Sequence, residues 1–253
     1  MQLKAFKLIL AAVAACVNCA VIAGPYVNVA SGQVERTLDT RKGRILGLSY
    51  KTRGVQFMRK GSPEFAFRVD GKIYDGHSAW KDLKVSDGKA KDGSRTVTVS
   101  AVSADGVAGL ELTYTTYPGI ALVRKTLTVS NKSNKEFFVT DVDVETFRQV
   151  ALNCEKSHVL RRFARYREEG GVYKGDWNDP LVVVHDFSSR CGIAIGNEGV
   201  STMKRTTVFE LGSFIVSGTP HTGDRFPFAK RLRPGESWTA MPVFTAPYIN
   251  CPD

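Results

Sequence analysis

The chain has 253 residues, of which 43% are hydrophobic and 24% are charged, with 23 glycines and 10 prolines. This composition is typical of a globular protein, and it excludes a disordered chain, a collagen-like rod and a multi-pass membrane protein. Lysine and arginine exceed aspartate and glutamate by 35 to 25, which gives a net charge of +10. Such an excess raises nucleic acid, an anionic surface or an acidic substrate as candidate partners.

Residues 1–23 have the pattern of an export signal. Lys4 and Lys7 form a basic start, and a continuous apolar run and a small-residue cleavage site follow. The run is shorter than the roughly 20 residues that a spanning helix needs. The Val-Ala-Ala-Cys sequence ending at Cys16 also resembles a bacterial lipobox, which would place a lipid on Cys16. We therefore expect an exported protein (periplasmic, secreted or lipid-anchored at the cell envelope) with no nucleic-acid partner and no membrane contact beyond that anchor.

From residue 24 onward, segment after segment alternates apolar with polar residues. The pattern is clearest in Ser94–Val102, Gly109–Tyr117, Ile120–Ser130 and Asp141–Thr146. Alternation of period two with β-branched and aromatic enrichment predicts half-buried strands, and Asp-Gly dipeptides between residues 70 and 106 supply turns between them. No segment shows helical periodicity and no linker divides the chain. We predict a single all-β domain over residues 24–253, a two-sheet supersandwich with mostly antiparallel strands.

Two of these strands carry charged residues within the alternating pattern. Lys125 shares a face with valines and a leucine, whereas Asp141, Asp143 and Glu145 follow one another on one face at about 7 Å spacing. A carboxylate row could bind Ca²⁺ or act on a sugar, since paired carboxylates hydrolyse glycosides. A solvated sheet face explains the row without any function, and this is what we expect.

An arginine-rich segment, His158–Glu169, interleaves four arginines with Phe163 and Tyr166. The pattern is that of a patch that stacks bases and binds phosphates. In an exported protein we expect instead an edge strand with a solvated basic face. Contact with an acidic glycan, through arginines stacked on the aromatic rings, is the alternative.

No catalytic, nucleotide-binding or calcium-binding motif occurs in the sequence. The histidines are His77, His158, His185 and His221. Because a zinc site needs closer pairs, we interpret these histidines as structural or surface residues. We expect no metal site and no cofactor.

The longest segment without alternation is Glu168–Pro180. It contains the candidate carbohydrate-binding residues Tyr173, Asp176, Trp177, Asn178 and Asp179. A sugar site needs a flat apolar platform for the C–H face of the ring and carboxylate or amide groups for its hydroxyls, and this segment offers all of them. An equal alternative is a loop held by Asx turns, with Trp177 anchored in the core.

Several short pieces of the chain occur in a familiar order. They are Tyr117-Pro118-Gly119, Val123-Arg124-Lys125, Val129-Ser130-Asn131, Gly175-Asp176-Trp177, Ile195-Gly196-Asn197-Glu198, Lys204-Arg205 and Leu232–Trp238. With these pieces the chain resembles, over most of residues 26–248, the N-terminal sandwich of family 36 glycoside hydrolases of the α-galactosidase type. The resemblance implies a galactose-mutarotase-like supersandwich. In that family the catalytic carboxylates lie on a following (β/α)₈ barrel, which we expect to be absent here because the sequence stops at Asp253, so no catalytic residue is carried over.

The leading hypothesis is an exported, non-catalytic, carbohydrate-associated domain. Its expected partners are a galactoside or other glycan, and a glycoside hydrolase catalytic domain or a second copy of the chain. An enzyme of the same fold is the first alternative, either a lyase or a mutarotase-type sugar epimerase with His185 and Glu198 or Glu210 as the acid–base pair. A structural or assembly protein that binds another polypeptide is the second.

Overall fold

The computed structural model describes residues 20–21, 24–152, 157–163, 165–170, 180–199, 202–209 and 214–250, with the backbone alone for 20–21, 157–163, 165–170 and 209. Regular structure in these ranges is β-strand apart from a 3₁₀ turn at Arg41–Gly43. The strands form three antiparallel sheets. No helix in the same ranges is long and apolar enough to span a membrane.

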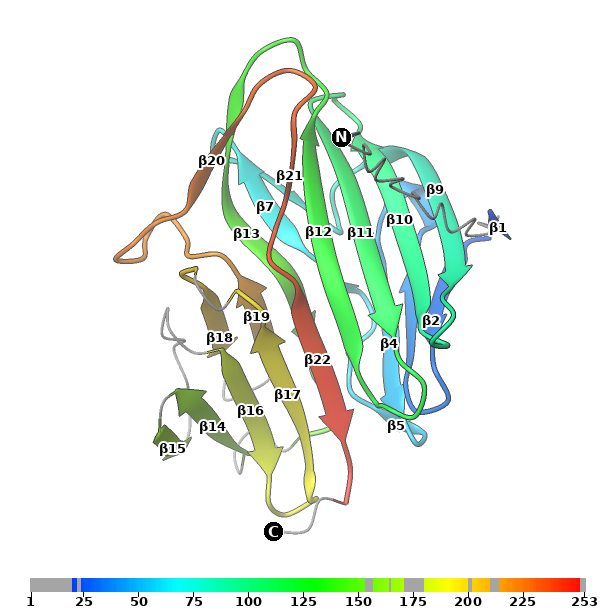
Figure 1. Cartoon of the computed structure of the whole chain (residues 1–253), viewed down its shortest axis with the longest axis vertical. Coiled ribbons are helices and arrows are strands. Elements are labelled where there is room, and N and C mark those ends of the chain that lie inside the picture. The colour runs from blue at the N-terminus through cyan, green and yellow to red at the C-terminus, as the bar shows by residue number, and fades with distance from the viewer. Residues whose placement is uncertain are drawn as a thin grey trace, which may run out of the picture.

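The largest sheet forms one layer of the molecule (Figure 1). Within the described residues its strands are, in spatial order, β1 (Ala20–Val21), β9 (Trp80–Lys89), β10 (Arg95–Ser103), β11 (Ala108–Thr116), β12 (Val123–Asn131), β22 (Val243–Tyr248), β17 (Cys191–Asn197), β16 (Leu181–Asp186), β14 (Ser157–Phe163) and β15 (Arg165–Gly170). β21 (Ser237–Thr239) pairs with one end of β12. Neighbours β9 to β12 follow one another in the chain, so short turns connect them, whereas β22 returns from the C-terminal end to continue the sheet.

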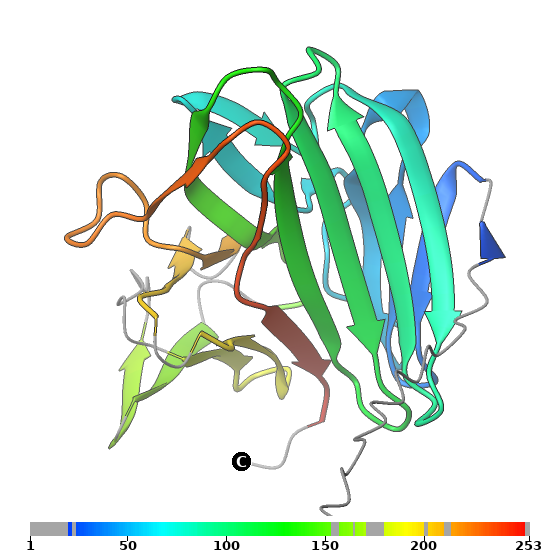
Figure 2. The ribbon, with the colours of Figure 1, turned by 45° about the horizontal axis from the view of Figure 1, so that its top comes forward.

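Two smaller sheets form the second layer. One contains β18 (Arg205–Phe209), β19 (Phe214–Gly218), β13 (Phe137–Arg148), β7 (Ala66–Val69) and β8 (Lys72–Asp75), with β20 (Ala229–Leu232) paired to β13. The other contains β2 (Tyr26–Ala30), β3 (Glu35–Asp39), β4 (Leu46–Thr52) and β5 (Val55–Gln56), with β6 (Ser62–Pro63) paired to β4. β2 packs against β10 and β11, β4 against β22, and β19 against β17. Figure 2 shows β2 and its neighbours behind the large sheet.

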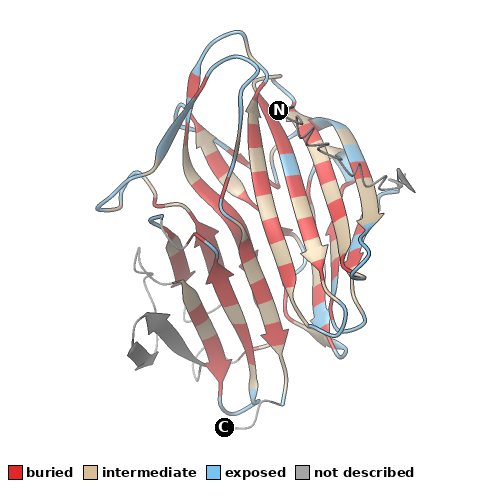
Figure 3. Cartoon of the chain, viewed as in Figure 1, coloured by how far each residue is buried: buried red, intermediate tan, exposed pale blue. Residues whose placement is uncertain are grey.

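Burial along the central strands follows the sequence alternation (Figure 3). In β12 every second residue is buried, from Val123 to Asn131, and the residues between them are half-buried on the outer face. β10 and β11 repeat the pattern. The predicted strands over residues 94–102, 109–117 and 120–130 are confirmed, and so is the all-β, antiparallel sandwich fold.

β13 departs from the expected pattern, and the prediction of a solvated carboxylate face is wrong. Residues 142–147 are all buried, including Asp143 and Glu145. The strand lies between β7 on one side and β20 and β19 on the other. Register shifts occur between Thr140 and Asp143 and between Asp143 and Glu145, and Asp141 has a positive φ of 49°. Such bulges interrupt the period-two alternation, so the carboxylates do not share one solvent face.

The arginine-rich segment also differs from expectation. It forms a hairpin of two strands, β14 and β15, rather than one edge strand. β15 is the last strand of the sheet path in the described residues, so the edge position holds for it alone. The strand continues to Gly170, which means that the start of the predicted 168–180 loop is strand.

Candidate functional site

A cavity of about 270 Å³ lies beside β13, where the ends of β17 and β19 approach the segment between β21 and β22. These elements are adjacent in Figure 1. Its apolar lining consists of Val144, Met203, Pro220, Phe226, Pro227, Phe228, Trp238, Ala240 and Met241. Concave, mostly apolar sites with a few polar groups are the usual form of ligand-binding sites, so this cavity is the candidate functional site.

The mouth of the cavity is an exposed apolar patch. Met203, Phe226 and Met241 are 44%, 37% and 46% exposed, although each is a large hydrophobic residue. Beside them the Trp238 ring packs on Phe228, with 4.8 Å between the ring centroids and 31° between the planes. Exposed apolar residues that gather around a cavity, rather than scatter singly, indicate a binding surface.

The floor of the cavity is set by a close approach of two strands. Gly218 of β19 pairs with Asp143 of β13, and a Cβ at Gly218 would stand 1.9 Å from the carbonyl oxygen of Val142. Only glycine allows this approach. It brings Val144, which is fully buried, under the cavity.

A histidine–carboxylate pair lies next to the cavity. Thr219 and Pro220 line the wall, and the next residue, His221, has its Nε2 atom 2.8 Å from Oδ1 of Asp143. Burial raises the pKa of the Asp143 carboxyl, and the hydrogen bond and charge of His221 oppose this rise only in part. The two side chains are therefore held within hydrogen-bond distance of each other, with His221 the more exposed partner.

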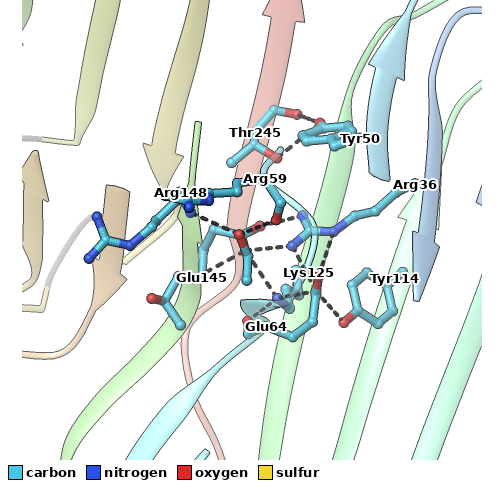
Figure 4. A network of polar contacts seen from close by, with 11 residues as sticks. Arg36, Tyr50, Arg59, Glu64, Tyr114, Lys125, Glu145, Arg148 and Thr245 are labelled. Atoms are coloured by element: carbon cyan, nitrogen blue, oxygen red, sulfur yellow. Dashed lines mark hydrogen bonds and ion pairs between the residues drawn. The ribbon is translucent and has the colours of Figure 1, made fainter. Parts of the chain in front are cut away.

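Four charged side chains form a separate cluster at the centre of the sandwich, here called the four-charge cluster: Arg36, Glu64, Lys125 and Glu145 (Figure 4). All four are buried. The guanidinium of Arg36 donates to Glu64 at 2.7 Å and to both oxygens of Glu145 at 2.7 and 2.8 Å. The ammonium of Lys125 lies 3.0 Å from Glu64 and 3.1 Å from Glu145.

Aromatic side chains surround the four-charge cluster, and one of them donates a hydrogen bond to it. The hydroxyl of Tyr114 donates to Glu64 at 2.8 Å, and the rings of Tyr50, Tyr114 and Phe147 stand 5.2–5.8 Å from the Arg36 guanidinium. Two cations balance two anions, and they come from β3, β12, β13 and the segment before β7. Because the cluster is enclosed and its charges are paired, we interpret it as a structural tie among the three sheets.

The sequence-predicted site residues fall mostly outside the described part of the chain. Cys16, Tyr173, Asp176, Trp177, Asn178, Asp179 and Glu210 all lie there, and their roles stay predictions. The structure pairs His185 with the Tyr248 hydroxyl at 2.9 Å, and Glu198 with Arg124 at 2.8 Å, rather than with each other. Among the described residues, no group of three or more His, Cys, Asp or Glu side chains could hold a metal ion.

The cavity residues themselves were missed by the strand-based reasoning. Asn197 and Trp238 lie in segments that carry the family resemblance, but neither was predicted as a site residue. A sequence signal exists for five of the others, which lie in the run Thr219–Phe228: this run lacks alternation and combines two prolines with two phenylalanines.

Comparison with known proteins defines the fold. No protein-family model matches the chain, and no curated protein matches it. Among solved structures, a GH36 α-galactosidase from Geobacillus stearothermophilus superposes with a TM-score of 0.64 at 12% identity, over 91% of this chain and 41% of that one. An α-galactosidase from Lactobacillus brevis gives 0.66 at 11%, over 88% and 39%. The chain thus has the fold of about two-fifths of these enzymes, as the resemblance implied.

A shorter structure shares the fold. A putative aldose 1-epimerase from Escherichia coli K12 superposes with a TM-score of 0.53 at 10% identity, over 88% of this chain and 99% of that one. The galactose-mutarotase-like supersandwich expected from the sequence is therefore confirmed.

Proposed function

We propose that this chain is a non-catalytic, carbohydrate-associated supersandwich that binds a glycan at the mouth of the cavity. The observation that carries the proposal is the exposed patch of Phe226, Met203 and Met241 beside the Trp238 ring. Flat apolar surfaces bind the C–H face of a sugar ring. The α-galactosidase fold supports the carbohydrate assignment by analogy.

Replacement of Trp238 by alanine tests the proposal directly. We expect galactoside affinity, measured by isothermal titration calorimetry, to fall roughly tenfold or more, because aromatic anchors at binding sites commonly contribute 2 kcal/mol or more. Trp238→Phe should retain part of the affinity. Ile120→Ala is the matched control, since Ile120 is an exposed apolar residue outside the cavity lining.

Two outcomes contradict the proposal. The first is the absence of binding by folded wild-type protein at millimolar concentrations of galactosides and of plant and host glycans. The second is equal affinity in the wild-type and Trp238→Ala proteins, which would place the sugar elsewhere, for example at the Asp176–Asp179 segment.

A mutarotase-type sugar epimerase is a second candidate function, and the His221–Asp143 pair favours it. Such a reaction moves protons to and from one sugar, and a hydrogen-bonded histidine and carboxyl are suited to that work. The fold that this chain shares with a putative aldose 1-epimerase also supports this candidate function. If the chain is such an epimerase, polarimetry on fresh α-galactose or α-glucose shows mutarotation faster than in buffer alone. The variant His221→Gln lowers that rate. A wild-type rate equal to buffer rejects this candidate and leaves glycan binding in place.

Export and partnership complete the proposal. The pattern of residues 1–23 supports export, with either cleavage near Ala23 or lipidation at Cys16. N-terminal sequencing and mass measurement of the protein from an envelope fraction distinguish the two. The α-galactosidase fold supports association with a glycoside hydrolase catalytic domain, which co-purification from the native source would reveal.

A further inference from the structure

The polar atoms in the cavity wall already have partners within the chain. The amide of Asn197 donates to the Gly218 carbonyl and accepts from the Gly199 N–H, each at 3.1 Å. The Thr219 hydroxyl oxygen accepts from the Val142 N–H at 3.1 Å, and the Thr202 hydroxyl donates to the Gly199 carbonyl. The Thr239 hydroxyl lies 2.9 Å from that of Thr128, and the remaining side chains of the wall are apolar. No buried side-chain polar atom of the described residues lacks a partner.

The interior and the mouth of the cavity therefore differ in which chemical groups they can bind. A sugar ring inside the cavity would bury several hydroxyls against methionine, phenylalanine and valine, and each unpaired hydroxyl would carry a desolvation penalty. At the mouth the same hydroxyls stay in water. The interior therefore suits an apolar group, and the mouth suits the sugar.

The dimensions and flexibility of the cavity fit such a group. A cavity of about 150 Å³ lined by aliphatic and aromatic residues binds benzene, and this one has about 270 Å³. Met203 and Met241, which flank the opening, have flexible, polarizable side chains that adapt to irregular apolar groups. An aryl ring or a short alkyl chain is accommodated.

A donor-rich group stands beside the mouth. The Arg225 guanidinium lies over the Phe226 ring, 5.2 Å from its centroid, and Arg225 is exposed. Its N–H groups can donate to sugar hydroxyls or to an acidic substituent at the place where a ligand leaves the cavity.

We propose that the ligand is an amphiphilic glycoconjugate, whose alkyl or aryl aglycone fills the cavity while its sugar rests on the mouth between Trp238 and Arg225. This inference rests on the proposed glycan-binding function and adds the chemical class of the ligand. The deciding observation is the combination of an apolar interior, whose polar atoms are internally paired, with an exposed aromatic mouth.

A homologous series of probes tests the inference. Methyl, butyl, hexyl and octyl β-galactopyranosides, each below its critical micelle concentration, are titrated calorimetrically, with butanol, hexanol and octanol as sugar-free probes. Each buried methylene should tighten binding about fourfold until the cavity is full. The glycosides should also bind more tightly than the alcohols of equal chain length.

The outcomes separate this inference from the proposed function. Equal affinity across the glycoside series overturns the aglycone site and leaves sugar binding intact. If the alcohols bind as tightly as the glycosides of equal chain length, the apolar pocket is supported, but the inference that the ligand is a glycoconjugate is overturned. No binding by any probe overturns both.

Two variants locate the site. Ala240→Leu adds volume at a buried position of the cavity wall and should remove the chain-length dependence, provided that circular dichroism shows a native fold. Met241→Lys, at an exposed position, should do so without disturbing the core, and Ile120→Lys is its surface control. Unchanged chain-length dependence in Met241→Lys, relative to the control, places the apolar group elsewhere and overturns the inference.

Discussion

Replacing Arg36 with methionine is expected to lower the free energy of unfolding by about 3–5 kcal/mol. The substitution keeps an unbranched apolar stem but removes the guanidinium that contacts both Glu64 and Glu145. Two buried carboxylates then face a single ammonium, that of Lys125. An uncompensated buried charge is costly because neither water nor another cation reaches it.

Urea denaturation followed by tryptophan fluorescence measures this loss. Arg41→Met is the matched control, because Arg41 makes an ion pair of the same length with Asp39, at 2.7 Å, but on the surface. Exposed pairs of this kind contribute little, so the control should change far less. Equal effects of the two substitutions would show that the four-charge cluster is solvated in solution, contrary to the structure.

The position of the four-charge cluster explains why its loss should affect the whole sandwich. Arg36 lies in the small β2–β6 sheet, Lys125 in the large sheet and Glu145 in the β13 sheet. The ion pairs that Glu145 forms with Arg36 and with Lys125 therefore each join two sheets. Glu64, in the segment between β6 and β7, contacts both cations. The adjoining aromatic residues add a second link between sheets, since the Tyr50 hydroxyl donates to the Thr245 carbonyl at 2.8 Å.

Strands β12 and β13 differ in how much of their structure could be predicted from the sequence. In β12 the period-two pattern is uninterrupted, so its face and pairing follow from alternation alone. The pattern even placed Lys125 on the apolar face, which is the one sequence signal that a buried partner exists. Which partner it has could not follow from alternation, because Glu145 comes from another sheet and Glu64 from the segment between β6 and β7.

In β13 the same reasoning failed for a physical reason. Bulges near Asp141 and Asp143 shift the register. The three acidic residues, which alternation predicts on one solvent-facing side, therefore lie in three different environments. Asp141 accepts a hydrogen bond from Thr222 and forms an ion pair with Arg68. Asp143 lies within hydrogen-bond distance of His221, and Glu145 pairs with Arg36 in the core. The cavity was equally hidden, because a loop, a strand end and a turn from distant segments form it.

The pH dependence of stability should reveal the charge on Glu145. Burial alone would raise the pKa of this carboxyl, but the adjacent Arg36 guanidinium and Lys125 ammonium outweigh burial and hold the pKa below its ordinary value of 4.5. The folded state therefore binds fewer protons than the unfolded state between these two pKa values. The stabilisation is complete above the unfolded-state pKa and is lost as the pH falls through the folded-state pKa.

Glu145→Gln isolates this contribution from the other titrating groups. Asp143 titrates in the opposite sense, since its raised pKa favours the folded state as the pH falls, and it is present in both proteins. The difference in unfolding free energy between wild type and Glu145→Gln should be about 3–5 kcal/mol at pH 7. It should stay constant down to about pH 5 and shrink at lower pH.

Urea midpoints measured at half-unit steps from pH 7 to pH 2.5 give that difference directly. A wild-type advantage that is already small at pH 7 would mean that Glu145 is not an ionised partner of Arg36. An advantage that grows on acidification would mean that its pKa is raised rather than lowered. In either case Arg36 would contact a protonated rather than an ionised Glu145, and the link between their two sheets would be a hydrogen bond to a neutral carboxyl instead of an ion pair.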